Sequence, residues 1–245
     1  MIFVTFDPYN IANDNIMNVF NIESILGDIM PFSEILKTRR TVRLYQQKPI
    51  PEKELEEIVD AARMAPSARN IQPLEYVVVD SEKLRKEMLP CIGLGGFVSS
   101  IVKDYSEKQP MAYAVVLVKK ELKGNWTNHD CGLALENLVL AAWEKGIASC
   151  IVANINRDKI RSLLKIPEEY DIDVLVTLGY PDEKPVAEEM ELRTEGGQKK
   201  EGDKSRLQAT GRLLGESDTP VFRDGKGVLR VPKRPLRKIL HRNGF

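Results

Sequence analysis

The sequence of 245 residues has no excess of charge of either sign, because 36 Lys and Arg balance 36 Asp and Glu. A dedicated nucleic-acid binder normally carries a large basic excess, so this balance argues against that class. The sequence also has no apolar run approaching the roughly 20 residues that a membrane helix needs. Residues 112–118, one of the longest such runs, number seven. We therefore expect no nucleic-acid partner and no membrane partner.

Cysteine and histidine are scarce. Cys91, Cys131 and Cys150 are widely spaced, form no CxxC pair and are odd in number. This pattern favours buried thiols in a reduced, cytoplasmic protein over a disulfide framework. His129 and His241 are the two histidines, which leaves little material for a metal site or a Ser–His–Asp triad. We expect no metal ion.

Charge of each sign is nevertheless distributed unevenly along the chain. Residues 1–32 carry four acids and no Lys or Arg, which is not the pattern of a signal peptide. Residues 37–43 hold four bases, and residues 229–245 hold six Lys or Arg and no acid. Two basic clusters at opposite ends of the sequence suggest an anion held between them. Solvated basic faces would give the same charge pattern.

Strands and helices alternate through the middle of the chain. Continuously apolar runs predict strands at residues 75–79, 113–118, 148–153 and 172–178. Apolar spacing and capping residues predict helices that begin at Ser33, at Pro51, at Ser81, at Asn128 or Asp130, and at Arg157. Because the strands are apolar throughout rather than alternating, we expect a sheet that is covered on both faces.

The sequence indicates one domain with appended segments. Residues 1–30 form an N-terminal extension whose order the sequence does not define, and residues 31–245 form the single domain. Within that domain we expect a charged, flexible insertion around residues 182–220 and a C-terminal arm over residues 221–245.

Two observations lead to these boundaries. In residues 182–205, 13 of the 24 residues are charged and four are apolar, so the segment buries too little surface to order itself. It is either a flexible loop or a segment that lies across another surface. Residues 221–231 read as a hairpin around Asp224-Gly225, a pair that favours tight turns.

Arg39-Arg40-Thr41-Val42-Arg43 is the first candidate binding site. Arginine binds phosphate in a bidentate manner that lysine does not match, and the Thr41 hydroxyl adds a donor. So short a motif often occurs by chance, so a solvated basic face remains the alternative.

Residues 65–73, with the sequence APSARNIQP, are the second candidate. The Asn70 amide is both a donor and an acceptor, which suits the N3–H and carbonyl edge of a flavin or base. Alternatively, Ser67 and Asn70 satisfy backbone groups of a turn. The third candidate is the helix over residues 130–145, whose small residues permit close approach of another helix or of a flat ligand; the alternative is a buried core helix.

In order and spacing, these elements resemble the FMN-dependent nitroreductase family. The matching motifs are the Arg-rich stretch, PSARNIQP, the Gly/Ala-rich helix with GIASC, LGYP and the basic PKRPL. The likeness covers roughly residues 33–181 and Pro232 to Leu236. It implies an α+β fold with a central mixed β-sheet flanked by helices, and an intertwined homodimer with two FMN sites at the subunit interface.

The resemblance also implies which residues bind FMN. Arg39, on the phosphate side, Thr41 and Arg43 would contact the cofactor, and Lys233 and Arg234 would complete the phosphate clamp. Arg43 is the candidate for stabilising the reduced flavin near N1 and O2.

Other cofactor contacts would come from the second subunit and from a strand. Ser67 and Asn70 of the partner would touch the isoalloxazine ring, Asn70 at its pyrimidine edge. Residues 151–154 would lie along the flavin, with the backbone of Ala153 and Asn154 near N5 and O4. No catalytic side chain is expected. The full expected cofactor-binding set is Arg39, Arg40, Thr41, Arg43, Pro66, Ser67, Ala68, Asn70, Gln72, Ile151, Val152, Ala153, Asn154, Lys233 and Arg234.

The implied activity is that of an oxidoreductase. NADH or NADPH would reduce FMN at N5 and leave, and a small-molecule acceptor would then take a hydride in the same place, in a ping-pong cycle. Since the cofactor carries the difficult step, scarce histidine is no objection. The acceptor is a nitroaromatic, a quinone, an enone or free flavin, and a specialised member that acts on flavin itself or on a halogenated aromatic is an alternative.

Two other classes of function remain open on the sequence alone. One is a non-catalytic FMN-binding or flavin-delivery protein. The other is an interaction protein that uses the acidic N-terminus and the charged segment of residues 182–205.

Overall fold

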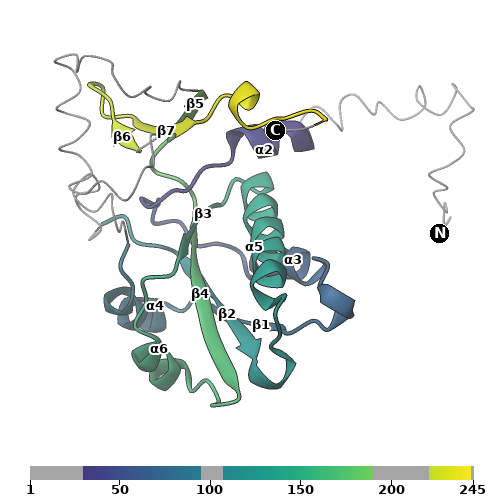
Figure 1. Cartoon of the computed structure of the whole chain (residues 1–245). Helices are drawn as coiled ribbons and strands as arrows, with labels where there is room; N and C mark the ends of the chain where they lie inside the picture. Colours follow the sequence, from purple (N-terminus) through teal and green to yellow (C-terminus); the bar gives the residue numbers. More distant parts are fainter. Residues whose placement is uncertain (1–29, 95–106, 190–220, 244–245) are drawn as a thin grey trace, which may run out of the picture. The chain divides into compact units, whose positions relative to one another are not determined.

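The computed structural model describes residues 30–94, 107–189 and 221–243 (Figure 1). The chain divides into two compact units, residues 1–37 and 38–245. Helix α2 (Phe32–Thr38) includes the point of division, since its last residue, Thr38, begins the second unit. Nearly all of the predicted N-terminal extension, residues 1–30, lies outside the described residues.

A four-stranded sheet forms the centre of the second unit. Its order is β1-β2-β4-β3, and every pairing between these strands is antiparallel. An isolated parallel bridge joins Thr41 to Ser149 at the outer side of β3 and gives the sheet its mixed character. The strands are β1 (Leu74–Val79), β2 (Ala112–Lys119), β3 (Ala148–Val152) and β4 (Tyr170–Gly179).

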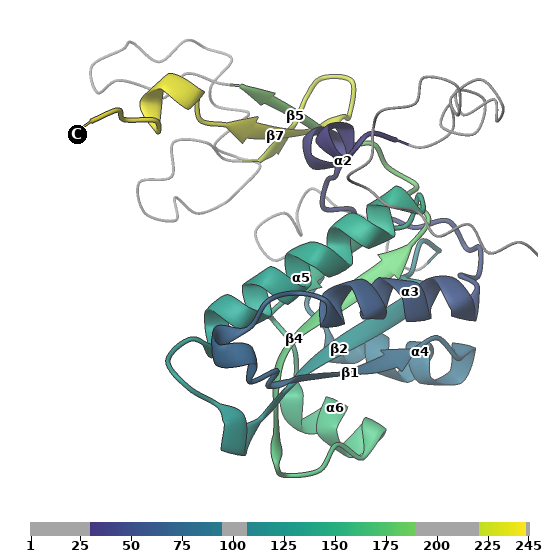
Figure 2. The ribbon, with the colours of Figure 1, turned by 90° about the vertical axis from the view of Figure 1, so that its right-hand side faces the viewer.

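Helices cover this sheet on both faces (Figure 2). Helices α3 (Glu52–Arg63) and α5 (Thr127–Glu144) pack on one face, and α4 (Glu82–Met88) and α6 (Arg157–Leu164) pack on the other. Alternate residues of β2 face the two layers, as the pleat of a strand requires: Val116 belongs to the core with α3 and α5, and Val115 to the core with α4 and α6. The apolar runs are continuous because both faces are buried.

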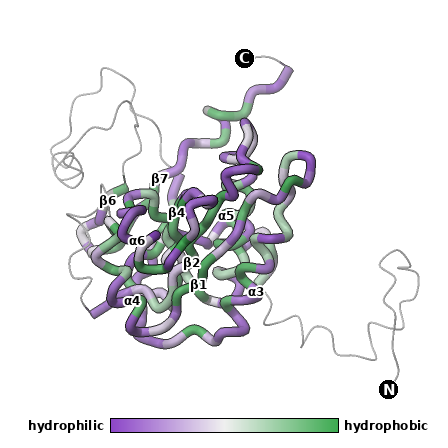
Figure 3. Tube along the Cα trace, turned by 90° about the horizontal axis from the view of Figure 1, so that it is seen from below, coloured by the Kyte–Doolittle hydropathy of each residue, from purple (hydrophilic) through white to green (hydrophobic). Residues whose placement is uncertain are grey.

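The hydropathy of the chain follows this layering. In Figure 3 the hydrophobic stretches concentrate in the strands, with more hydrophilic stretches around them. All three cysteines are free and buried, as expected. Among the residues that the structure describes, no helix is long and apolar enough to cross a bilayer, and no three His, Cys, Asp or Glu side chains are grouped to hold a metal ion.

Helix α5 begins at Thr127, before the predicted caps Asn128 and Asp130. The Gly124 N–H donates to the Thr127 hydroxyl at 2.8 Å, and the Asp130 N–H donates to the Trp126 carbonyl at 3.0 Å. Residues 124–127 therefore form a turn that leads into the helix, and Asp130 lies in the first helical turn with its carboxylate available for another role.

A second, three-stranded sheet has the order β5-β7-β6 and comprises β5 (Val186–Glu189), β6 (Phe222–Arg223) and β7 (Leu229–Lys233). The prediction of a flexible loop is wrong for residues 186–189, which pair in parallel with β7. Backbone pairing with a distant strand orders these four residues. From residue 190 to 220, the predicted insertion lies outside the described residues.

The predicted hairpin of residues 221–231 is present, but its turn is not a tight Asp224-Gly225 pair. Residues 224–228 connect β6 to β7, because Arg223 pairs with Leu229. The Asp224 carboxylate accepts the N–H groups of Lys226 and Val228, both at 2.9 Å. Gly227, with φ +78°, takes the left-handed position.

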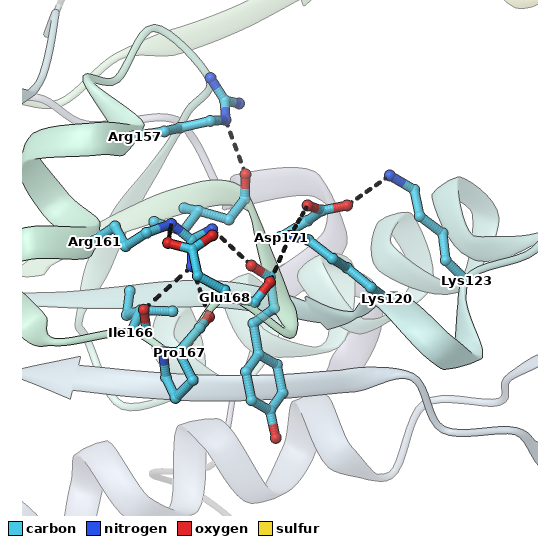
Figure 4. A network of polar contacts seen from close by, with 10 residues as sticks. Lys120, Lys123, Arg157, Arg161, Ile166, Pro167, Glu168 and Asp171 are labelled. Atoms are coloured by element: carbon cyan, nitrogen blue, oxygen red, sulfur yellow. Dashed lines mark hydrogen bonds and ion pairs between the residues drawn. The ribbon is translucent and has the colours of Figure 1, made fainter.

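A network of polar contacts fixes the connection from α6 to β4 (Figure 4). The Arg161 guanidinium donates to the carbonyls of Ile166 at 3.2 Å, Pro167 at 2.6 Å and Tyr170 at 2.7 Å. These bonds hold the residues that follow α6, whose last turn ends at Lys165 with φ +53°. Arg161 thereby sets where β4, a central strand, begins.

We predict that Arg161→Ala lowers the free energy of unfolding by about 2 kcal/mol, because hydrogen bonds from a charged donor to three carbonyls are lost. Urea denaturation followed by circular dichroism measures this change. Lys159→Ala, at an exposed position on the same helix, serves as the control. A loss as small as that of the control would contradict the role given to Arg161.

Candidate functional site

The Arg-rich segment lies against the outer side of β3. The Val42 N–H donates to the Ser149 carbonyl at 3.0 Å, and the Val42 side chain is fully buried. In an extended segment, the residues on either side of an inward-facing residue point the other way. Thr41 and Arg43 accordingly remain partly exposed beside β3.

Arg43 combines a fixed backbone with an unsatisfied side chain. Its N–H donates to the Glu183 carboxylate at 2.7 Å. Its Nε is buried and has no hydrogen-bond partner. Buried donors in folded proteins are almost always paired, so an unpaired one indicates a missing acceptor, such as a ligand.

Arg39 and Arg40 bring two more positive charges to this segment. Arg39 Nε lies 4.0 Å from Glu136 Oε1 on α5, and the Arg40 guanidinium donates to the Arg39 carbonyl. Burial, and secondarily the charge of Arg39, lowers the pKa of Arg40. Neighbouring cations that disfavour each other's charge are stabilised by a bound anion.

The free side of β3 offers backbone groups next to these arginines. Because the Ser149 carbonyl faces Val42, the N–H and carbonyl of Ile151 face the same way, away from β4. The Ile151 carbonyl accepts a long contact from the Cys150 thiol at 3.7 Å. No other described residue is hydrogen-bonded to these two groups, and the Ile151 side chain is 44% exposed. Val152 faces β4 instead.

The predicted strand over residues 151–154 ends sooner than expected. β3 stops at Val152, and Ala153 and Asn154 form an exposed turn. The Ala153 carbonyl accepts the Ile155 N–H at 3.0 Å, and the Asn154 carbonyl accepts the Gly93 N–H at 2.8 Å. A Cβ on Gly93 would lie 2.1 Å from the Asn154 amide nitrogen, so a larger residue at position 93 would displace the exposed Asn154 side chain.

The loop that follows Pro66 holds a strained backbone. Arg69, Asn70 and Gln72 have φ of +53°, +55° and +53°, a region that non-glycine residues rarely adopt. The Ser67 hydroxyl accepts the Gln72 N–H at 3.0 Å, as in the turn alternative. Asp130 Oδ1 accepts the Ala68 N–H at 2.9 Å, so α5 anchors the loop.

A cavity of about 350 Å³ lies between this loop and the start of α5. Exposed Trp126 and Ile71 are among the residues that contribute to its wall. The lining consists of Ala68, Arg69, Ile71, Leu122, Gly124, Asn125, Trp126, Thr127 and Asp130.

Within one chain, the loop and the Arg-rich segment contact α5 at different positions along the helix axis. The Trp143 indole N–H donates to the Thr38 hydroxyl at 3.0 Å, whereas Asp130 holds Ala68. Thirteen residues of helix separate Trp143 from Asp130, or about 20 Å along the axis. Arg39 contacts Glu136 of α5. Glu136 lies about 9 Å from Asp130 along the helix axis. The described residues thus form two separate groups of expected FMN contacts.

The basic motif near the C-terminus belongs to the second sheet. Lys233 ends β7 opposite Glu189, and Lys233 and Arg234 are both exposed. That sheet connects to the Arg-rich segment through Glu183, whose Oε2 lies 3.5 Å from Arg223 Nη2 on β6.

The sequence analysis missed Glu183 and the anchoring role of Asp130. Glu183 lies just after the LGYP motif in a highly charged segment, and composition does not reveal that its side chain is 7% exposed. Asp130 was noticed as a cap. Its place one turn after Trp126 was the available signal that its buried carboxylate could accept an N–H from a neighbouring segment.

The fold and the site define an α+β protein with a cationic segment beside an open strand edge. The family model for the nitroreductase family matches residues 36–180. The chain belongs to the nitroreductase family. The family and the fold class expected from the sequence are therefore confirmed.

The chain is also similar to individual proteins and to solved structures. A protein of Archaeoglobus fulgidus, provisionally named NADH dehydrogenase/NAD(P)H nitroreductase, is 33% identical over 162 residues, 62% of this chain and 86% of the relative. The iodotyrosine deiodinase of Thermotoga neapolitana is 27% identical over 61% of this chain and 88% of its own. The solved structure of an FMN-dependent nitroreductase from Clostridium difficile R20291 is 26% identical and has a TM-score of 0.51, over 62% of this chain and 88% of that one.

We predict that Asp130→Ala loosens the loop of residues 67–72. Without an acceptor for the Ala68 N–H, the strained conformation loses its anchor, and amide hydrogen exchange in the loop rises about tenfold. Hydrogen–deuterium exchange with mass spectrometry measures the change, and Asp158→Ala at an exposed site on α6 is the control. Unchanged exchange in the loop would refute the anchoring role.

Proposed function

We propose that this chain is an NAD(P)H-dependent oxidoreductase that binds FMN along the free side of β3 and reduces a nitroaromatic, a quinone or a similar small molecule in a ping-pong cycle. The observation that carries the proposal is the buried, unpaired Nε of Arg43 beside the open Ile151 backbone. FMN has a phosphate, ring carbonyls and ring nitrogens, which match cationic side chains and backbone N–H donors. The names of the relatives support both the cofactor and the nicotinamide donor.

The chain's first task is to hold the phosphate. Arg39 and Arg40 supply adjacent guanidinium groups, and Lys233 and Arg234 supply two more cations from the end of β7 and just after it. Arginine gives bidentate, orienting contacts, and lysine adds a point charge. The lowered pKa of Arg40 fits a cluster that gains stability when an anion binds.

Its second task is to orient and tune the ring. When bound, FMN supplies hydride transfer between the nicotinamide and the acceptor. Arg43 would stabilise the negative charge of the reduced ring, and the Ile151 N–H would contribute a backbone donor. No general acid or base side chain is assigned.

The third element is the loop that contains Ser67 and Asn70, which we assign to the ring of the partner subunit's cofactor. The separation of this loop from the Arg-rich segment along α5 supports a homodimer in which each site draws on both chains. We further propose a cytoplasmic enzyme, in keeping with its three free thiols.

A visible spectrum of the purified protein tests the function directly. We expect a yellow protein, or one that takes up FMN, whose flavin band bleaches on anaerobic addition of NADH or NADPH. Bound flavin that does not bleach would favour the non-catalytic flavin carrier. Failure to bind FMN would refute the proposal and favour an interaction protein.

Arg43→Ala tests the tuning role. Loss of this positive charge should lower the two-electron midpoint potential of bound FMN by about 30 mV, which corresponds to about 1.4 kcal/mol, or weaken FMN binding about tenfold. Spectroelectrochemistry and fluorescence titration measure the two quantities. Arg63→Ala, which removes an exposed arginine of α3, is the matched control. If Arg43→Ala left both quantities unchanged, the assignment would be wrong.

Hybrid dimers test the shared site. Arg43→Ala and Asn70→Ala should each impair both sites of a homodimer. After equal mixing and subunit exchange, half of the dimers are hybrids with one intact site, so about a quarter of the wild-type activity returns. No recovery would show that both residues serve the cofactor of their own chain.

The acceptor has one alternative that a comparison favours. Because a relative is an iodotyrosine deiodinase, a halogenated aromatic is kept beside nitroaromatics and quinones. Steady-state assays with one member of each class, at fixed NADPH, separate these acceptors.

A further inference from the structure

Two anion-binding stretches that are far apart in the sequence meet at one carboxylate, that of Glu183. Its Oε1 accepts the Arg43 N–H at 2.7 Å, and its Oε2 lies 3.5 Å from Arg223 Nη2. Arg43 ends the Arg-rich segment, and Arg223 lies on the sheet that carries Lys233. The side chain of Glu183 is 7% exposed, although most of its neighbours in the sequence are charged and exposed.

The backbone before Glu183 is held firmly. The Gln46 N–H donates to the Tyr180 carbonyl and the Asp182 N–H to the Leu44 carbonyl, both at 2.9 Å. Glu183 therefore projects from a segment that is already paired with the residues following Arg43. Its carboxylate has a defined place from which to reach Arg223.

Arg223, on the other side of the contact, is connected to the basic motif through the second sheet. Arg223 pairs with Leu229 of β7, and Lys233 lies four residues further along the same strand, about 13 Å away. A displacement of Arg223 consequently moves the strand that carries Lys233 and leads into Arg234. The ion pair with Glu183 thus links the placement of this basic motif to the Arg-rich segment.

The charge of Glu183 also has a local effect. One of its oxygens lies beside the cation of the partly buried Arg223, and the other accepts the backbone N–H of the partly exposed Arg43. Burying a carboxylate is unfavourable unless cations and donors surround it. Here Oε1 accepts the Arg43 N–H, whereas Oε2 is buried, has no hydrogen-bond partner and has the Arg223 guanidinium as an ion-pair partner at 3.5 Å. Removing one partner of such a set is strongly destabilising for the arrangement that remains.

We propose that Glu183 is a positioning residue for the flavin phosphate: by joining Arg43 to Arg223, it fixes Lys233 and Arg234 relative to Arg39, and the preference for FMN over riboflavin depends on its carboxylate. This inference rests on the proposed function. Riboflavin lacks the phosphate, so the ratio of the two affinities isolates the phosphate clamp from contacts with the ring.

The test compares FMN and riboflavin binding to full-length apoprotein by quenching of flavin fluorescence. Glu183→Gln keeps the size of the side chain and an acceptor for the Arg43 N–H, but removes the charge that holds Arg223. We expect about tenfold weaker FMN binding and riboflavin binding within about twofold of wild type. If Glu183 were merely a nearby negative charge, its removal would instead tighten FMN binding, and that result would overturn the proposal.

Arg223→Gln removes the contact with Glu183 from the other side, together with the hydrogen bond from Arg223 to the Gly227 carbonyl at 2.7 Å, and serves as a second, independent variant. It should also lower the FMN-to-riboflavin preference, and the double variant should be no worse than either single one, because both act through one pair. Glu188→Gln is the matched control, since Glu188 pairs with Arg230 within the second sheet, at 3.6 Å, and does not contact Arg43. Thermal unfolding confirms that each variant is folded.

The two hypotheses fail in different ways. A wild-type chain that binds neither flavin refutes the proposed function and this inference with it. A wild-type chain that prefers FMN, together with folded Glu183 and Arg223 variants of unchanged preference, refutes the inference alone. Additive losses in the double variant would also refute it, because the two residues would then act separately.

Discussion

The site depends on one hydrogen bond at the outer side of β3, from the Val42 N–H to the Ser149 carbonyl. This bond buries Val42 against the sheet and brings the flanking arginines beside the strand. It also fixes which backbone groups of β3 face outward, because alternate residues of a strand point their N–H and carbonyl groups to opposite sides. The open Ile151 backbone and the unpaired Arg43 Nε are both consequences of this register.

Helix α5 acts as a spacer between the two groups of expected cofactor contacts. Its first turn holds the strained loop through Asp130, its middle meets Arg39 through Glu136, and its last turn holds Thr38 through Trp143. The length of this helix therefore sets the separation between the Arg-rich segment and the loop. Small residues along α5 matter less as a flat-ligand surface than the three side chains that anchor other segments to it.

The helices and strands that depend on local sequence patterns could be predicted from the sequence. The strands at β2 and β4 were evident because burial on both faces requires unbroken apolar runs, and α6 begins at Arg157 as predicted because its spacing and caps are local. Strand β5 was missed because its order comes from backbone pairing with β7, some 40 residues later. Glu183 was missed for the same reason, since its partner Arg43 lies 140 positions away. Arginine-rich composition located the candidate site, but only the fold located the carboxylate that organises it.

The open side of β3 has a consequence for the solubility of the newly synthesised chain. A strand edge with unpaired backbone groups and a half-exposed isoleucine is a template for pairing with another polypeptide, and such edges promote aggregation unless they are covered. Among the described residues, the Ile151 side chain is 44% exposed and its carbonyl has one long contact, from the Cys150 thiol. A flat cofactor laid along the edge would block this self-association, so cofactor supply would govern the solubility of the chain as well as its chemistry.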